Sequence, residues 1–288
     1  MDSFKKYIRI TLLMVLLLSA EVAKMNDESV ASEELKLRFI NIFGLFSLHF
    51  LITFPSFLKD GSTSLFNRLL KKELPNPDIN VDNIIVLIHG KNSNPRQFLN
   101  MCNYLSKYLK ENNLNNFTPF GVHLPNGSES VINDAKSVYE QLYQKFGSIK
   151  KRNVYIIGVS KGGVTACYTA TIQDPVFIIS KVMTVSSPLK GTLVAKYASC
   201  ETTQKELSYN NSFLIQLENS INEMCKNKNL KIYHVVPKWD HLIIPTSSSR
   251  YSNTPNENII NYNGYANHIG IQNNVNVISQ IIKLLFNN

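Results

Sequence analysis

Short, continuous runs of apolar residues recur along the second part of the chain, each bounded by polar or turn-forming residues. A run without polar alternation is typical of a strand that is buried on both faces in a parallel sheet. The run at 84–88 is of this kind, and further strand-like runs at 154–157, 182–185, 232–236 and 259–262 are mostly apolar but include Thr184, His234 and Asn261. An amphipathic stretch from Val275 to Phe286 predicts a C-terminal helix. The pattern therefore predicts an α/β protein with a mainly parallel central sheet and helices on both faces.

The run at 154–157 leads into the hexapeptide Gly158-Val159-Ser160-Lys161-Gly162-Gly163, and a stretch of small, helix-compatible residues follows it. A turn this tight between strand and helix leaves no room for side chains two residues before and after the serine, which are Gly158 and Gly162. The serine hydroxyl then projects from the sheet edge, and the amide of Lys161 can stabilise an oxyanion. Because a predicted strand precedes the motif and a predicted helix follows it, the motif indicates a nucleophile elbow more strongly than an ordinary Gly/Ser turn.

Two later residues occupy positions suited to an acid and a base. Asp240 lies a few residues beyond the run at 232–236, and His268 follows the run at 259–262. Asp240 is expected to orient the histidine, with an ordinary turn or N-cap role as the alternative. His268 is the expected general base because the base of such a set comes last in the chain. The other histidines are less well placed, and they are His49, His89, His123, His234 and His241.

From about residue 83 to residue 288 the chain resembles an α/β-hydrolase, and within that superfamily the lipase/esterase branch. The chain order Ser160, Asp240, His268 is the order found in that fold. The other residues that carry the resemblance are His89-Gly90, the elbow 158–163, Ser187-Pro188-Leu189-Lys190-Gly191 and Asn267-His268-Ile269-Gly270. Three departures leave the subfamily open, namely Val159, Lys190 and the lack of a glycine before Asp240.

The resemblance implies an α/β-hydrolase fold in a minimal version without the usual first two strands. It also implies a small cap or lid insertion, about 192–230, before the acid-bearing strand. The backbone N–H of Lys91 is expected to be the second oxyanion donor, whereas His89 is expected to be structural. An apolar stripe at helical spacing favours either an amphipathic lid or plain core packing, and it comprises Phe213, Leu214, Leu217, Ile221 and Met224.

The N-terminal 82 residues have a different character. Basic residues at 5, 6 and 9 precede an apolar core at 10–20, which predicts a signal peptide or signal anchor over 1–24. Cleavage after Ala20 or Ala23 and an uncleaved anchor both stay open. The region 25–82 contains an apolar stretch at 39–58 that fits either a membrane span or an interfacial or core-docking helix. The expected location is the secretory pathway, with the protein secreted or membrane-anchored, and 83–288 is the expected catalytic domain.

Composition and charge limit the classes of binding partner that the sequence predicts. The chain has 288 residues, is 44% hydrophobic and carries a formal net charge of +9. Residues 1–82 hold ten Lys/Arg and ten Asp/Glu, so the excess positive charge lies in the catalytic region. The basic residues are scattered and accompany no nucleic-acid-binding motif. Weak attraction to anionic lipid surfaces and a merely solvated basic surface are the two interpretations.

The four cysteines divide into two pairs by position. Cys102 and Cys167 fall in predicted helices and are expected to be small core residues. Cys200 and Cys225 both lie in the expected insertion, where a disulfide between them would fit a secretory route. The sequence shows no metal-binding constellation, and a Ser-His-Asp set needs neither a metal nor a cofactor.

Taken together, these residues predict a serine hydrolase of the lipase/esterase type that cleaves carboxylic esters of lipids through an acyl-enzyme. An acyltransferase or a glycolipid-anchor deacylase could use the same triad. A membrane-tethered, non-catalytic binding protein on this scaffold is the alternative from another class, and the intact Ser-Asp-His set argues against it. Acyl-chain length, head group and oligomeric state are not specified by the sequence.

Overall fold

The computed structural model describes residues 73–124, 129–197, 201–227, 229–264, 268 and 270–286. The expected signal segment 1–24 and the apolar stretch 39–58 lie outside these ranges. Within the described ranges, every helix is too short or too polar to cross a bilayer.

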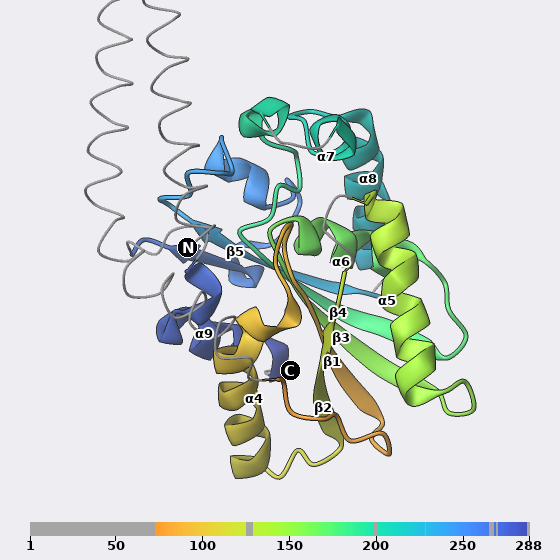
Figure 1. Ribbon diagram of the computed structural model, residues 1–288. Coiled ribbons are helices and arrows are strands. Elements are labelled where there is room, and N and C mark those ends of the chain that lie inside the picture. The colour runs from red at the N-terminus through yellow and green to blue at the C-terminus, as the bar shows by residue number, and fades with distance from the viewer. Residues whose placement is uncertain are drawn as a thin grey trace, which may run out of the picture. The chain divides into compact units, whose positions relative to one another are not determined.

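A six-stranded sheet forms the centre of the described fold (Figure 1). Its strand order is β2-β1-β3-β4-β5-β6, and every neighbouring pair is parallel. The strands are β1 Asn83–Ile88, β2 Phe117–Val122, β3 Arg152–Val159, β4 Phe177–Val185, β5 Lys231–Pro237 and β6 Ile259–Tyr262. The predicted parallel sheet is confirmed, and the carboxyl ends of its strands meet at one edge.

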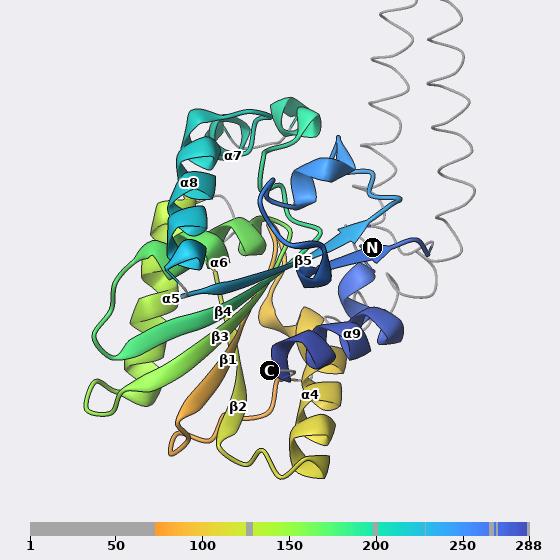
Figure 2. The ribbon, with the colours of Figure 1, turned by 180° about the vertical axis from the view of Figure 1, so that it is seen from behind.

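Helices cover both faces of this sheet (Figures 1 and 2). Ile84, Val86 and Ile88 of β1 contribute to a core cluster with α5, α6 and α8, whereas Ile85 and Leu87 contribute to a second cluster with α4 and α9. Because alternate residues of β1 enter different cores, the strand must be apolar throughout. The helices are α4 Leu99–Glu111, α5 Val131–Phe146, α6 Lys161–Thr171, α7 Glu201–Glu206, α8 Ser212–Lys226 and α9 Val275–Phe286.

Strand β2 has no counterpart among the sequence-based expectations. Pro119 and Gly121 interrupt its apolar pattern, and both residues are depleted in strands. The strand nevertheless pairs with β1 over its full length and lies at the end of the sheet. An edge position tolerates proline because the strand has a neighbour on one side only.

The expected insertion contains α7 and α8, which lie between β4 and β5. Leu214, Leu217 and Ile221 of α8 are buried in the same core cluster as α6. The ring of Phe213 also lies against Tyr168 of α6, with centroids 5.8 Å apart. The apolar stripe of α8 therefore packs on the core in this structure, and the lid over about 192–230 stays a prediction.

His234 of β5 provides a pH-sensitive element in this core. Its side chain is fully buried, with Nδ1 2.7 Å from Thr184 Oγ1 and Nε2 3.0 Å from Thr254 Oγ1. Burial, reinforced by the positive charges of Arg250 and Lys190, lowers the pKa of His234 to about 3. The folded protein thus keeps this imidazole neutral at pH values where the unfolded chain protonates it.

We expect the free energy of unfolding to fall as the pH drops from about 6.5 towards 3, because only the unfolded state takes up the proton of His234. The full contribution is roughly 5 kcal/mol at most. His234→Gln, which keeps a donor and an acceptor, should lose stability at pH 7 but show a shallower decline between about pH 6.5 and 4. Urea unfolding at several pH values measures both slopes. Parallel slopes in the two proteins would contradict the assignment.

Candidate active site

The turn between β3 and α6 holds Ser160 in an uncommon backbone conformation. Its φ is 56° and its ψ is −128°, a region that residues other than glycine rarely adopt. A Cβ on Gly158 would lie 2.3 Å from the carbonyl oxygen of Gly162, and one on Gly162 would lie 2.4 Å from that of Ile88. Side chains at either position would collide with backbone, so both glycines are needed for the turn. The half-buried Ser160 is thereby held at the carboxyl edge of the sheet.

The loop after β1 passes directly against this serine. A Cβ added to Gly90 would lie 3.0 Å from Ser160 Cβ and 3.3 Å from the carbonyl oxygen of Val159. Lys91 follows Gly90 in this loop, and Lys161 is the first residue of α6. The first turn of a helix favours negative charge through its N–H groups and its dipole. The two predicted oxyanion donors therefore belong to the two segments that adjoin Ser160.

His89 holds the loop after β1 in place. The ring is buried, and its Nε2 accepts a hydrogen bond from the backbone N–H of Leu124 at 2.9 Å. Its Nδ1 lies 2.8 Å from the carbonyl oxygen of Gly90. An Nε2 that accepts leaves the proton on Nδ1, which then donates to Gly90. Both ring nitrogens are engaged in linking the loops after β1 and β2, in agreement with the expected structural role.

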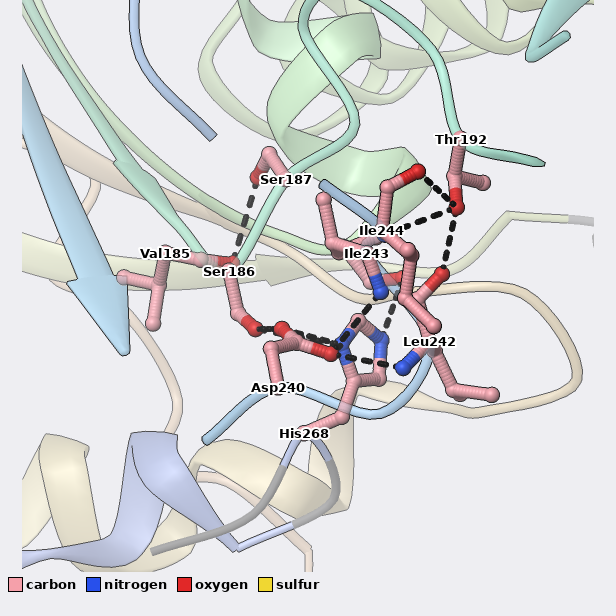
Figure 3. Close-up of polar contacts among 10 residues, drawn as sticks. Val185, Ser186, Ser187, Thr192, Asp240, Leu242, Ile243, Ile244 and His268 are labelled. Atoms are coloured by element: carbon pink, nitrogen blue, oxygen red, sulfur yellow. Dashed lines mark hydrogen bonds and ion pairs between the residues drawn. The ribbon is translucent and has the colours of Figure 1, made fainter. Parts of the chain in front are cut away.

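The structure brings Ser160, Asp240 and His268 together although they are far apart in sequence. His268 Nε2 lies 2.9 Å from Ser160 Oγ. On the other side of the ring, His268 Nδ1 lies 2.9 Å from Asp240 Oδ2 and 3.1 Å from Oδ1 (Figure 3). Asp240 and His268 are buried, whereas Ser160 is partly accessible. This is the geometry of a nucleophile, a base and an orienting carboxylate.

The carboxylate of Asp240 is held by the chain that follows it. Its Oδ1 accepts the backbone N–H of Leu242 at 2.8 Å and of Ile243 at 2.9 Å. Burial by itself would raise the pKa of Asp240, but the charge and hydrogen bond of His268, the charge of His241 and the Ser186 hydroxyl outweigh it and lower that pKa to about 2. Asp240 therefore stays ionised, as an orienting group must. Its local turn and its contact with His268 coexist, so the two interpretations of Asp240 are not exclusive.

The competing histidines lie elsewhere or have other contacts. His234 is buried in β5, and His123 is exposed just beyond β2, with its ring 5.9 Å from that of His89. The ring of His241 lies 6.4 Å from the ring of His268 in a perpendicular arrangement. His49 lies outside the described residues.

The side chain of Lys161 forms a contact that the sequence did not predict. Its Nζ lies 2.8 Å from Asp134 Oδ2 on α5 and also donates to the carbonyl oxygen of Glu129. Both charged side chains are buried, and burial raises the pKa of Asp134 against the opposing charge of Lys161. The pair fixes the start of α6 to α5. The available signal was Asp134 itself, a carboxylate on the apolar face of α5 between Val131 and Val138.

Ser186 is the second residue that sequence reasoning missed. It follows β4, and its hydroxyl donates to Asp240 Oδ2 and lies 3.0 Å from His268 Nδ1. No local pattern distinguishes it from Ser187 beside it. Only the fold brings it to the acid and the base.

The described cysteines are reduced. Cys102 and Cys167 are buried in the core, as expected, and burial raises the pKa of each thiol to about 12. Cys225 carries a free thiol, and Cys200 lies outside the described residues. The pairing of Cys200 with Cys225 therefore stays a prediction. Over the described part of the chain, no group of three His, Cys, Asp or Glu side chains could hold a metal ion.

The sequence matches no protein-family model and no curated protein. Among solved structures, the chain is similar to the lipase BlEst2 of Bacillus licheniformis in its propeptide form, with a TM-score of 0.51, 14% identity and coverage of 75% of this chain and 53% of that one. It is also similar to the lin2722 gene product of Listeria innocua, with a TM-score of 0.50, 14% identity and coverage of 72% and 95%.

A further match is the phospholipase PlaB of Legionella pneumophila, with a TM-score of 0.45 and 11% identity. That match covers 54% of this chain and only 39% of PlaB. The sheet order, the all-parallel pairing and the likeness to the first two structures establish that the chain has an α/β-hydrolase fold.

Proposed function

We propose that the protein is a serine hydrolase of the lipase/esterase type that cleaves carboxylic esters of lipids through an acyl-enzyme. The observation that carries the proposal is the continuous contact from Ser160 Oγ through both ring nitrogens of His268 to Asp240, with 2.9 Å at each step. An α/β-hydrolase fold presents such a set at the carboxyl edge of its sheet, where substrates bind.

In the proposed reaction, His268 Nε2 takes the proton of Ser160 as Oγ attacks the ester carbonyl carbon. The carbonyl oxygen becomes an oxyanion beside the amides of Lys91 and Lys161. The imidazolium then protonates the leaving alcohol, and the acyl group stays on Ser160. Water adds to this acyl-enzyme with His268 again as base, which releases the carboxylic acid and restores the serine. Asp240 keeps the Nδ1 proton in place throughout.

Leu193 is an exposed apolar residue beside the loop that carries Asp240. Thr192 Oγ1 donates to the carbonyl oxygen of Leu242 at 2.8 Å, and Leu193 N donates to that of Ile244 at 2.9 Å (Figure 3 shows Thr192 beside this loop). Leu193 is held next to the loop that carries Asp240, yet it is 53% exposed. A single exposed leucine is common on protein surfaces, so the proposal of a lipid acyl group is supported by the apolar stretches 10–20 and 39–58 and not by Leu193.

Location in the secretory pathway, with a membrane surface as partner, is part of the same proposal. Its support is the basic segment and the apolar stretches 10–20 and 39–58. Recovery of the full-length chain from the cytosol of producing cells would contradict it, and carbonate extraction of membranes separates a span from peripheral attachment.

Hydrolysis of nitrophenyl esters by the full-length protein tests the function. The acyl chain is varied from acetyl to palmitoyl, and we expect saturable hydrolysis that favours the longer chains. Addition of an alcohol acceptor distinguishes hydrolysis from acyl transfer, since a transferase would form the new ester at the expense of free acid. Absence of turnover on every carboxylic ester would contradict the proposal and favour a binding protein.

A further inference from the structure

Ser186 occupies a strained and buried position at the end of β4. Its φ is 51°, in the left-handed region where side chains other than those of Asn, Asp and Gly are uncommon. The residue is fully buried, and its backbone N–H donates to the carbonyl oxygen of Val235 at 3.0 Å. The neighbouring strand therefore fixes the backbone of Ser186. A non-glycine residue held this way at a site of chemistry invites a functional explanation.

The hydroxyl of Ser186 contacts both the acid and the base. Its Oγ donates to Asp240 Oδ2 and lies 3.0 Å from His268 Nδ1 (Figure 3). The other oxygen of Asp240 already accepts two backbone N–H groups. With His268 and Ser186 on Oδ2, both carboxylate oxygens are held by donors, and the carboxylate cannot rotate without breaking several of these bonds.

Proton counting gives the direction of each bond. For His268 Nε2 to accept the proton of Ser160, the neutral ring must carry its hydrogen on Nδ1. Ser186 has a single hydroxyl proton, and that proton is donated to Asp240. The oxygen of Ser186 consequently presents a lone pair to Nδ1–H. The ring thus faces two acceptors, the carboxylate and the hydroxyl, which both favour the tautomer that leaves Nε2 basic.

We propose that Ser186 is a positioning residue for the reaction, because its hydroxyl fixes the Asp240 carboxylate and the reactive tautomer of His268. Its hydroxyl contacts Asp240 and His268, so it acts through the acid and the base. This inference rests on the proposed hydrolase function.

Two substitutions remove the hydroxyl with opposite effects on the backbone. Ser186→Gly relieves the left-handed strain, whereas Ser186→Ala retains it. Each should lower kcat by roughly tenfold to a hundredfold, as expected for the loss of a hydrogen bond to a charged group, with KM little changed. The glycine variant should also melt within about 4 °C of the wild type. If kcat fell only in the variant whose melting temperature also fell, and was unchanged in the other variant, Ser186 would have a structural role only.

Ser187→Ala is the matched control. Ser187 is equally buried and adjacent in sequence, but its hydroxyl donates to the carbonyl oxygen of Val185 at 3.2 Å and contacts neither Asp240 nor His268. Its removal should leave kcat within about threefold of the wild type. An equal loss in both serine variants would contradict the proposal.

The decisive experiment is a double-mutant cycle with Asp240→Asn. Because Ser186 acts through the carboxylate, Ser186→Gly should cost less than about threefold in the Asp240→Asn background, against tenfold or more in the wild type. Equal costs in both backgrounds would overturn the inference. If Ser160→Ala removes activity while Ser186→Gly does not change it, only this inference fails. If Ser160→Ala leaves activity intact, the hydrolase assignment fails as well.

Discussion

Ser160→Ala is expected to reduce ester hydrolysis by roughly 10⁴-fold or more, because it removes the atom that forms the acyl-enzyme. The substitution deletes one half-buried hydroxyl. Alanine and serine both carry a Cβ, so the strain of the positive φ at residue 160, between Gly158 and Gly162, is unchanged. Folding should therefore be preserved, with a melting temperature within about 4 °C of the wild type. Initial rates on a soluble short-chain ester, measured beside circular dichroism, give both quantities. A folded variant with wild-type turnover would contradict the nucleophile assignment.

His268→Ala is expected to be about as damaging as Ser160→Ala, since the two residues act as a unit. The substitution removes the base that lies 2.9 Å from Ser160 Oγ and takes its proton in the proposed reaction. Asp240→Asn should retain more activity than His268→Ala, because the base survives but its tautomer is no longer enforced. Steady-state kinetics on one ester measure all three variants.

His123→Ala is the matched control for this series. His123 is exposed beyond β2, and its ring lies 5.9 Å from that of His89. Its loss should leave kcat within about threefold of the wild type. If His123→Ala or His241→Ala inactivates the protein while His268→Ala does not, the base has been misassigned.

The sheet was predictable from sequence wherever a strand contains a mostly apolar run. The run at 84–88 predicted β1 because each of its faces enters a different core, and the elbow was found because its glycines are required within six residues. Strand β2, at the edge of the sheet, was not predicted because Pro119 and Gly121 interrupt its apolar pattern. The role of the stripe in α8 was undecidable because core packing and lid formation require the same apolar spacing.

The site was predictable only in part for a related reason. Chain order pointed to Asp240 and His268, since the order of the elements fixes which loop contributes which group. Ser186 donates a hydrogen bond to Asp240, which lies 54 residues later in the sequence, and Lys161 forms an ion pair with Asp134 on a different helix. Such contacts depend on how two loops or helices come together in space, and no local spacing encodes them. They emerge only after the strand register is known.

Reaction of the full-length protein with a fluorophosphonate is the most direct test of whether Ser160 is an activated nucleophile. We expect one covalent adduct per chain, located by peptide mass spectrometry on Ser160, with simultaneous loss of ester hydrolysis. Labelling should be absent from Ser160→Ala and strongly slowed in His268→Ala, because the serine must be activated to react. A folded protein that hydrolyses esters yet carries no adduct on Ser160, or carries it on another residue, would contradict the account.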